Sequence, residues 1–195
     1  MQQHQQAGAI LAQAFHHYPL MLHAFEGKTE TQRSKGLHQL YQHCAAACAK
    51  YGYVNVTADK QGAIICLPGS SFPLGLWREV RSGMALIPLK LGAKTTLRLI
   101  NHDAIGEGWI KRNAGSNMGY IWCLGVLDSA RGKGYSRLLI DQSIAEMKQQ
   151  GMDEFWLKTE DPKNVTIYQK LGFDLIQELD VSNSGLKSWV MKRAV

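Results

Sequence analysis

The sequence predicts a domain of the α/β or α+β class, in which helices pack on one central sheet. Two observations support this prediction: a nearly all-apolar run at 120–126 that leads into a glycine-containing turn, and an alternation of strand and helix patterns from there to the C-terminus. The chain has 195 residues, of which 45% are apolar, so it can bury one sizeable core, and we expect a single domain over 1–195. The sparse prolines and the absence of an apolar run of about eighteen residues exclude disordered, collagen-like and membrane-spanning chains.

The first half of the chain predicts two opening helices, a hairpin and a helical insertion. These elements are expected at 7–25 and 31–51, at 53–57 and 63–67, and at 72–113. The helices follow from apolar residues at helical spacing, and the hairpin follows from two short β-branched runs separated by turn residues. The insertion is expected to be interrupted at four breaker residues: Gly83, Pro88, Gly92 and Gly106.

The second half predicts strands that alternate with helices. Strands are expected at 120–126, 155–159, 173–179 and 186–191, and a helix is expected at 135–150. A further short helix begins after Asp161, the expected N-cap, and ends at Leu171-Gly172. The strand at 120–126 is apolar on both faces, which indicates the centre of a sheet that helices cover on both sides.

The net charge is +6, and the surplus of bases collects in one segment. Residues 77–115 carry the bases Arg78, Arg81, Lys90, Lys94, Arg98, Lys111 and Arg112 against the acids Glu79, Asp103 and Glu107. Such a surplus attracts polyanions, but a solvated helix face is an equally good interpretation. Because no recognisable DNA- or RNA-binding motif accompanies it, nucleic-acid binding ranks last, and we expect neither a nucleic acid nor a membrane as partner.

The cysteines and histidines do not predict a metal site. Cys44 and Cys48 stand at helical spacing in an alanine-rich stretch, which favours packing, and the chain contains no C-x-x-C or H-E-x-x-H pattern. The glutamine-rich segment 1–6 lacks Lys and Arg, and Gln13 interrupts the apolar patch that follows. We therefore expect no secretory signal and a cytoplasmic protein with reduced thiols.

The turn between the central strand and the next helix is a predicted anion site. Gly132 and Gly134 let an anion approach the backbone closely, and the helix N-terminus exposes unpaired N–H groups. Three bases add charge at this corner: Arg131, Lys133 and Arg137. The spacing fits neither a Walker loop, because Leu127 stands at the place of its first glycine, nor a dinucleotide fingerprint, because Arg137 replaces its third glycine.

The segment Arg131-Gly132-Lys133-Gly134-Tyr135-Ser136 resembles the pyrophosphate loop of the GNAT superfamily of N-acetyltransferases, which has Gln or Arg at its first position, Gly at its fourth and Gly or Ala at its sixth. The segment 164–173 is similar to that superfamily's N-x-x-x-Y-x-K-x-G-F helix and strand. The resemblance covers about the last 80 residues and implies a mixed, mostly antiparallel sheet with a splayed pair of central strands. Two features depart from the pattern: Ser136 at the sixth position, and no first strand before the opening helices. The insertion at 72–113 is similar to the puromycin acetyltransferase-like branch.

The resemblance implies an N-acetyltransferase that transfers the acetyl group of acetyl-CoA to a primary amine, on a small molecule or peptide, by direct attack in a ternary complex. It assigns to acetyl-CoA binding the residues Leu124, Gly125, Val126, Arg131, Gly132, Lys133, Gly134, Tyr135, Ser136 and Asn164. Unpaired N–H groups of a strand edge opened at Gly125 would stabilise an oxyanion, while the simpler interpretation is that Gly125 relieves a packing clash.

The superfamily's general acid corresponds to Tyr168. Asn164 and Tyr168 stand four residues apart on one helix face, and Ile167 and Leu171 are expected to face the core. A phenol with a pKa of about 10 stays protonated at neutral pH and can hand its proton to a departing thiolate, whose acid has a pKa of about 8.5. The alternative is a core aromatic with its hydroxyl at the rim.

The proton acceptor is less clearly marked in the sequence. Glu160 is the first candidate, because it ends the second central strand, and His102, Asp103 and Glu107 in the insertion follow it. An acyl-enzyme is not expected, and Cys123, next to the site, is the one residue that could carry it.

A different class of function also fits the loop, namely a catalytically silent acyl-CoA-binding module. The sequence leaves open which amine accepts the acetyl group and what the oligomeric state is, a homodimer included.

Overall fold

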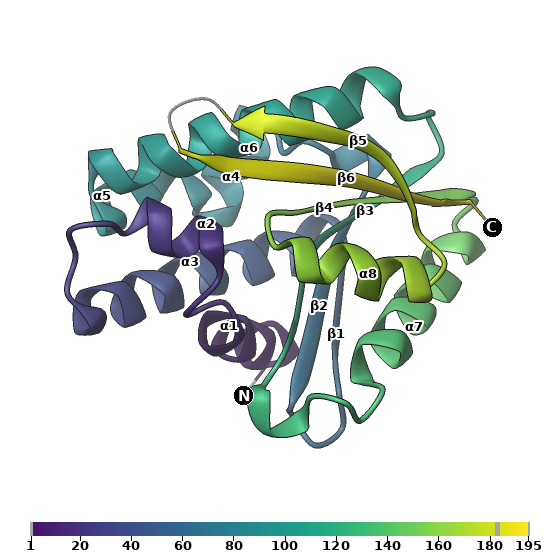
Figure 1. The fold of residues 1–195 in the computed structure, drawn as a ribbon, viewed down its shortest axis with the longest axis horizontal. Coiled ribbons are helices and arrows are strands. Elements are labelled where there is room, and N and C mark those ends of the chain that lie inside the picture. The colour runs from purple at the N-terminus through teal and green to yellow at the C-terminus, as the bar shows by residue number, and fades with distance from the viewer. Residues whose placement is uncertain (1, 182–183, 195) are drawn as a thin grey trace.

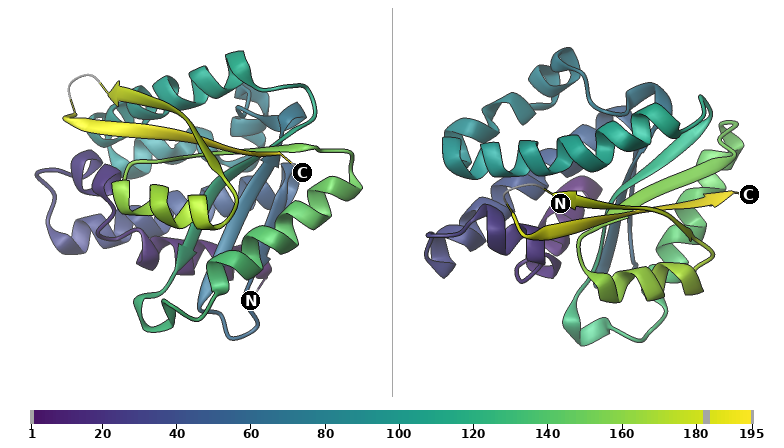
Figure 2. Two further views of the ribbon diagram at one scale, coloured as in Figure 1. Left: turned by 45° about the vertical axis from the view of Figure 1, so that its right-hand side comes forward. Right: turned by 45° about the horizontal axis from the view of Figure 1, so that its top comes forward.

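The computed structural model describes residues 2–181 and 184–194, and within them a six-stranded sheet in the order β1-β2-β3-β4-β6-β5 forms the centre (Figure 1). The strands are β1 (Tyr53–Val56), β2 (Gly62–Pro68), β3 (Met118–Val126), β4 (Glu154–Thr159), β5 (Asp174–Val181) and β6 (Leu186–Ala194). Neighbouring strands are antiparallel except β3 and β4, which are parallel. Helices cover both faces, as the turned views show (Figure 2). The predicted fold class is therefore confirmed. The single-domain prediction extends to Met1 and Val195, which lie outside the described residues.

The opening helices are α1 (Gln3–Ala14), α2 (Pro19–Ala24) and α3 (Glu30–Tyr51). The prediction of one helix over 7–25 is wrong, because the chain leaves α1 at Phe15 and starts again at Pro19. Proline lacks a backbone N–H and has a fixed φ, so it begins a helix more readily than it continues one. The break places Tyr18 at the N-cap of α2, and its hydroxyl reaches the end of β4.

The insertion contains α4 (Leu76–Ser82), α5 (Ile87–Leu91) and α6 (Ala93–Asn113). Gly83 and Gly92 interrupt it as predicted, whereas Gly106 lies inside α6 without breaking it. A Cβ atom at Gly106 would lie 2.6 Å from Cδ of Lys158 and 3.1 Å from Oγ of Ser188. Glycine is therefore needed here because α6 packs closely on β4 and β6. None of the helices in the described ranges is long and apolar enough to cross a membrane.

The remaining helices are α7 (Tyr135–Gln149) and α8 (Pro162–Lys170). The predicted N-cap of α8 is confirmed, since the Asp161 carboxylate accepts a hydrogen bond from the backbone N–H of Lys163 at 3.0 Å. The expectation that Ile167 faces the core is wrong, because this residue is 48% exposed. Leu171 is buried as expected, and Tyr168 packs against the same core, so α8 buries the side that carries Tyr168 and Leu171 and exposes Ile167.

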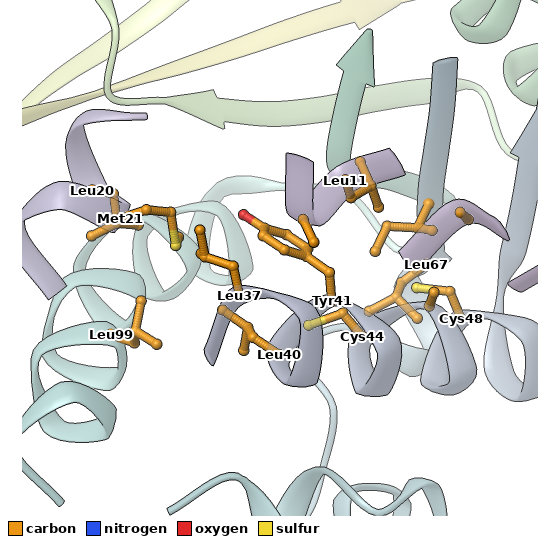
Figure 3. Close-up of a cluster of buried hydrophobic side chains, with 14 of the residues drawn as sticks. Leu11, Leu20, Met21, Leu37, Leu40, Tyr41, Cys44, Cys48, Leu67 and Leu99 are labelled. Atoms are coloured by element: carbon orange, nitrogen blue, oxygen red, sulfur yellow. The ribbon is translucent and has the colours of Figure 1, made fainter. Parts of the chain in front are cut away.

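Two hydrophobic cores lie on opposite faces of the sheet, because successive strand residues point to opposite sides. In β2, Ile65 and Leu67 join the core under α1, α3 and α6, while Ile64 and Cys66 join the core under α7. Figure 3 shows the first core, where Tyr41, Cys44 and Cys48 of α3 lie among leucines of several elements. The predicted packing role of Cys44 and Cys48 is confirmed by their burial.

The contact between α1 and β3 depends on Gly125. A Cβ atom there would lie 2.8 Å from Cβ of Ala14 and 3.1 Å from Cδ2 of Leu11. These distances favour the interpretation that Gly125 relieves a packing clash. The N-terminal helix thereby lies directly against the central strand, and no strand precedes it within the described residues.

This contact predicts that substitutions at Gly125 and Ala14 have non-additive effects on the free energy of unfolding. Gly125→Ala should destabilise the fold by about 1–3 kcal/mol through overpacking. Ala14→Gly removes the nearest clash, so the double variant should be less destabilised than the sum of the single variants, by at least about 0.5 kcal/mol. Urea unfolding of the four proteins measures both effects. Additive free energies would show that α1 moves away instead of clashing.

Candidate active site

The carboxyl ends of β3 and β4 separate in the middle of the sheet. The two strands pair only from Met118 to Tyr120 on β3 and from Glu154 to Trp156 on β4. Beyond Tyr120, β3 continues beside β2 alone. The predicted splayed pair is thus confirmed, and the separation leaves one edge of β3 without a strand partner.

A cleft of about 250 Å³ lies at this separation. Its lining includes Leu124 of β3, Glu160 after β4, and Asn164 and Tyr168 of α8, which are four of the residues that the sequence singled out. Residues of α2, α3 and the insertion complete the lining. The cleft therefore extends from the separated ends of β3 and β4 to the insertion.

Tyr168 is held in the cleft by its own helix and by the following strand. Its ring packs edge-on against Phe173, with 5.9 Å between ring centroids. Its hydroxyl makes no hydrogen bond to any residue that the structure describes. Burial, followed by the negative groups nearby, raises the pKa of this phenol above its ordinary value, so it stays protonated at neutral pH.

An ionic cluster borders the same cleft. Lys158 of β4 places its Nζ 2.8 Å from Oδ1 of Asp103 and 3.0 Å from Oε1 of Glu160. Burial disfavours the charge on Asp103 and on Lys158, but the attraction between the opposite charges of the cluster is stronger. It lowers the pKa of Asp103 to about 2 and raises the pKa of Lys158 well above its ordinary value. Two carboxylates therefore share one ammonium group.

Glu160 has partners at both carboxylate oxygens. Oε1 accepts from Lys158 and from the Ser188 hydroxyl at 3.3 Å, and Oε2 accepts from the Tyr18 hydroxyl at 3.0 Å. The backbone N–H of Glu160 in turn donates to the Tyr18 oxygen at 2.7 Å. These contacts hold the carboxylate rigidly, with only 5% of the residue exposed.

The other candidates for proton acceptor lie beside this cluster. His102 is buried, and its Nδ1 lies 3.9 Å from one oxygen each of Asp103 and Glu160, without a hydrogen bond at either ring nitrogen in the described part of the chain. Glu107 accepts from the Tyr120 hydroxyl at 3.4 Å. Burial, reinforced by the charge of Asp103, raises the pKa of Glu107 to about 8, so its carboxyl is mainly protonated at neutral pH.

Sequence reasoning missed two residues of this site, Lys158 and Tyr18. A signal for Lys158 was present: two residues after the buried Trp156 it lies on the same face of the strand, and a lysine on the buried side of a strand needs a carboxylate partner. Tyr18 carried no comparable signal, because its place depends on the break before Pro19.

The turn before α7 has the form expected of an anion site. Gly132 and Gly134 have φ angles of 79° and 81°, and no side chain caps the N-terminus of α7. A Cβ atom built on either glycine meets no atom within 4 Å, so the backbone is open to an approaching group. The fit to a phosphate is therefore good, both in space and in the direction of the helix dipole.

Side chains of this turn are partly engaged elsewhere. Arg131 forms an ion pair with Asp128 at 2.7 Å, and the Tyr135 hydroxyl donates to the Asp59 carboxylate in the β1–β2 turn. Lys133 is exposed and Ser136 is half-buried. The turn lies outside the cleft lining, so a ligand that used both would have to be long.

Of the other predicted site residues on β3, some lie outside the cleft lining and one lines the cleft. Gly125 and Val126 pair with Ala63 and Gly62 of β2 and do not line the cleft. Cys123 does line it, but burial raises the pKa of its thiol well above the ordinary value. A thiol held protonated is a poor nucleophile, which argues against an acyl-enzyme.

The basic segment at 77–115 is partly used in internal contacts. Arg98 forms an ion pair with Glu26, and Arg78 donates to the backbone oxygen of Ser70 at 2.9 Å. Lys90 donates to the Gln39 side chain at 3.0 Å. These contacts favour the interpretation of this segment as a helix surface.

Comparisons with known proteins agree with this geometry. A model of the acetyltransferase (GNAT) family matches residues 90–173. An uncharacterised N-acetyltransferase of Schizosaccharomyces pombe is 23% identical over 192 residues, which are 94% of this chain and 76% of that protein. Arylalkylamine N-acetyltransferase 2 of Aedes aegypti has the same fold, with a TM-score of 0.66 and 17% identity over 98% of this chain and 94% of that one. The chain spans 58% of a putative acetyltransferase of Agrobacterium tumefaciens, matched over 40% of this chain at 23% identity and a TM-score of 0.38.

The matched segment contains α6, β3, the turn before α7, β4 and α8, which are the elements that build the cleft and the anion site. These comparisons indicate an acetyltransferase of the GNAT superfamily. The same comparisons indicate an acyltransferase that uses acetyl-CoA. The narrower likeness to the puromycin acetyltransferase-like branch stays a prediction.

The raised pKa of Glu107 predicts a pH dependence of stability. The folded-state pKa of about 8 lies above the ordinary 4.5, so the stabilising contribution is complete below about pH 4.5 and is lost as the pH rises through about 8. Glu107→Gln keeps an acceptor for Tyr120 without this titration. The variant should match the wild type near pH 5 and be more stable near pH 9, by on the order of 1 kcal/mol or more. Thermal unfolding across this range tests the prediction, and parallel curves for the two proteins would contradict it.

Proposed function

We propose that the protein acetylates a primary amine by direct attack on acetyl-CoA within a ternary complex. The observation that carries the proposal is the meeting of the unpaired edge of β3 and the Tyr168 hydroxyl in one cleft. In the net reaction an N–C bond forms and the C–S bond breaks. The ammonium form of the amine loses two protons, of which the sulfur gains one and the solvent receives the other. The chain must therefore hold the acetyl donor, accept a proton from nitrogen and supply one to sulfur.

Binding of acetyl-CoA is proposed to use two parts of the chain. The backbone of the turn Arg131–Ser136 and the N-terminus of α7 would hold the pyrophosphate. The edge of β3 at Leu124, Gly125 and Val126 would hold the pantetheine arm, with Asn164 nearby. The open backbone at Gly132 and Gly134 supports this assignment. Acetyl-CoA supplies a thioester carbonyl, which an amine attacks, and a thiolate leaving group.

Tyr168 is proposed to act as the general acid. Its burial keeps the phenol protonated, and its hydroxyl has no competing partner among the described side chains, so the proton is free for a departing thiolate. Glu160 is proposed as the proton acceptor. Among the described residues, the Tyr18 hydroxyl is the one hydrogen-bond partner of its Oε2, and a hydroxyl can rotate to pass a proton.

The role of the turn predicts a difference between two matched glycines. Gly134 and Gly151 stand at opposite ends of α7, with φ angles of 81° and 86° and open space where a Cβ atom would lie. Gly134→Ala and Gly151→Ala should therefore cost similar stability, on the order of 1 kcal/mol. Only Gly134→Ala should weaken acetyl-CoA binding, by about tenfold or more in titration calorimetry. Equal affinities for the two variants would remove the turn from the site.

The role of Tyr168 predicts a selective loss of turnover. Tyr168→Phe removes only the hydroxyl, so kcat should fall by roughly a hundredfold to ten-thousandfold. The acetyl-CoA affinity and the Tm should change little, because the ring still packs on Phe173. Tyr51→Phe, outside the cleft lining, is the control and should keep full activity.

Three results would go against this role. A Tm that falls together with kcat would indicate a structural hydrogen bond. Full activity of Tyr168→Phe would move the acid role elsewhere. Tight acetyl-CoA binding by the wild type without acetylation of any amine would favour a silent binding module.

A further inference from the structure

The cleft continues from β3 and α8 into a wall of apolar side chains. This wall consists of Leu20, Met21, Leu40, Met84, Ile87 and Leu99. Figure 3 shows Leu20 and Met21 of α2, Leu40 of α3 and Leu99 of α6 converging from three helices. Aliphatic and thioether groups offer no hydrogen bonds, so a polar body bound here would lose its contacts with water without replacement. The wall therefore favours an uncharged, apolar body.

The charged side chains that the cleft offers to a ligand are negative. The charged lining residues in the described ranges are Glu79, Asp103, Lys158 and Glu160. Lys158 is the only base in this set, and two carboxylates already surround its ammonium group. A ligand carboxylate would thus find no free cation in the lining, and the negative side chains of the lining would repel it.

Asp103 is the carboxylate that remains open. Its Oδ1 binds Lys158, while its Oδ2 makes no hydrogen bond within 2–181 or 184–194. Its side chain is 36% exposed, compared with 4% for the side chain of Glu160, whose oxygens are both engaged. Glu79 also borders the cleft, but it stands on α4, none of whose residues is buried, so solvent screens its charge more strongly.

We propose, on the basis of the acetyl transfer proposed above, that the acceptor is a monoamine on an apolar body that carries no carboxylate. Its ammonium group binds Oδ2 of Asp103, and its body lies against the wall of α2, α3, α5 and α6. Lys158 positions both the binding carboxylate and the proton acceptor Glu160, because its Nζ contacts one oxygen of each. The amine is thus bound beside the group that is to deprotonate it.

The first test compares pairs of acceptors that differ by one charged group, with acetyl-CoA and the wild-type protein. Phenethylamine and phenylalanine differ by a carboxylate, and hexylamine and 1,6-diaminohexane differ by a second ammonium group. The monoamine of each pair should have the higher kcat/KM, by about a hundredfold for the first pair, since the added carboxylate is buried without a partner.

The second test locates the ammonium group. Asp103→Asn should raise the KM of phenethylamine by about tenfold or more and leave the affinity for acetyl-CoA unchanged. Asp141→Asn is a matched control, because Asp141 of α7 pairs with Arg193 of β6 and lies outside the cleft lining. Glu79→Gln tests the other open carboxylate. A larger rise of KM in Glu79→Gln than in Asp103→Asn would overturn the assignment to Asp103.

The outcomes separate this inference from the proposed function. Preference for phenylalanine or for the diamine would overturn the inference and leave acetyl transfer to amines intact. Acetyl-CoA binding without acetylation of any acceptor would overturn both. The comparison of acceptors needs no variant, so it stays decisive even where Asp103→Asn lowers the yield of folded protein.

Discussion

The separation of β3 from β4 is the constraint on which the site depends. Parallel strands that stayed paired to their ends would satisfy each other's backbone groups and close the sheet. Here the pairing stops after three residues, and the freed edge of β3 faces side chains of α8 and the insertion. The sheet tolerates the gap because each strand keeps its other neighbour, β2 for β3 and β6 for β4. The sheet thus stays stable although one edge of β3 is left unpaired.

The charges at the mouth of this gap form a second level of organisation. A buried lysine is costly unless carboxylates surround it, and Lys158 has two of them, from different elements. The cluster joins the insertion to β4, since Asp103 belongs to α6 and Glu160 follows the strand. The same contacts lower the pKa of Asp103 to about 2, and the charge of Asp103 helps to keep Glu107 protonated. Neighbouring carboxyls consequently occupy opposite protonation states at neutral pH.

Local patterns predicted those parts of the molecule that short-range physics determines. The apolar run of β3, the glycines before α7 and the N-cap at Asp161 each have a local cause, and the structure contains all of these elements. The wrong predictions at Gly106 and Ile167 concern tertiary contacts. Gly106 was expected to break a helix, but it makes room for Lys158, and Ile167 was assigned to the wrong face because periodicity alone does not locate the core.

The candidate site was predictable in part for the same reason. Glu160, His102 and Asp103 were singled out separately by residue type and position, but only the fold brings them within a few ångströms of Lys158. Tyr18 could not be found from sequence, because its contact with Glu160 spans 142 positions and follows from the break between α1 and α2. Lys158 lies on a regular strand, but its role depends on tertiary partners, so it was missed as well.

The glycine in the middle of α6 links the rigidity of a helix to the chemistry of a cleft. In an ordinary exposed helix, exchanging glycine for alanine is among the simplest ways to make a protein more heat-resistant, with a gain of about 1 kcal/mol. At Gly106 the added methyl group would press on the side chain of Lys158, which sets the charge balance around Asp103 and Glu160. An engineer who strengthens this helix would also retune the electrostatics of the cleft. Thermostability and acceptor selectivity are therefore not independent design variables at this position.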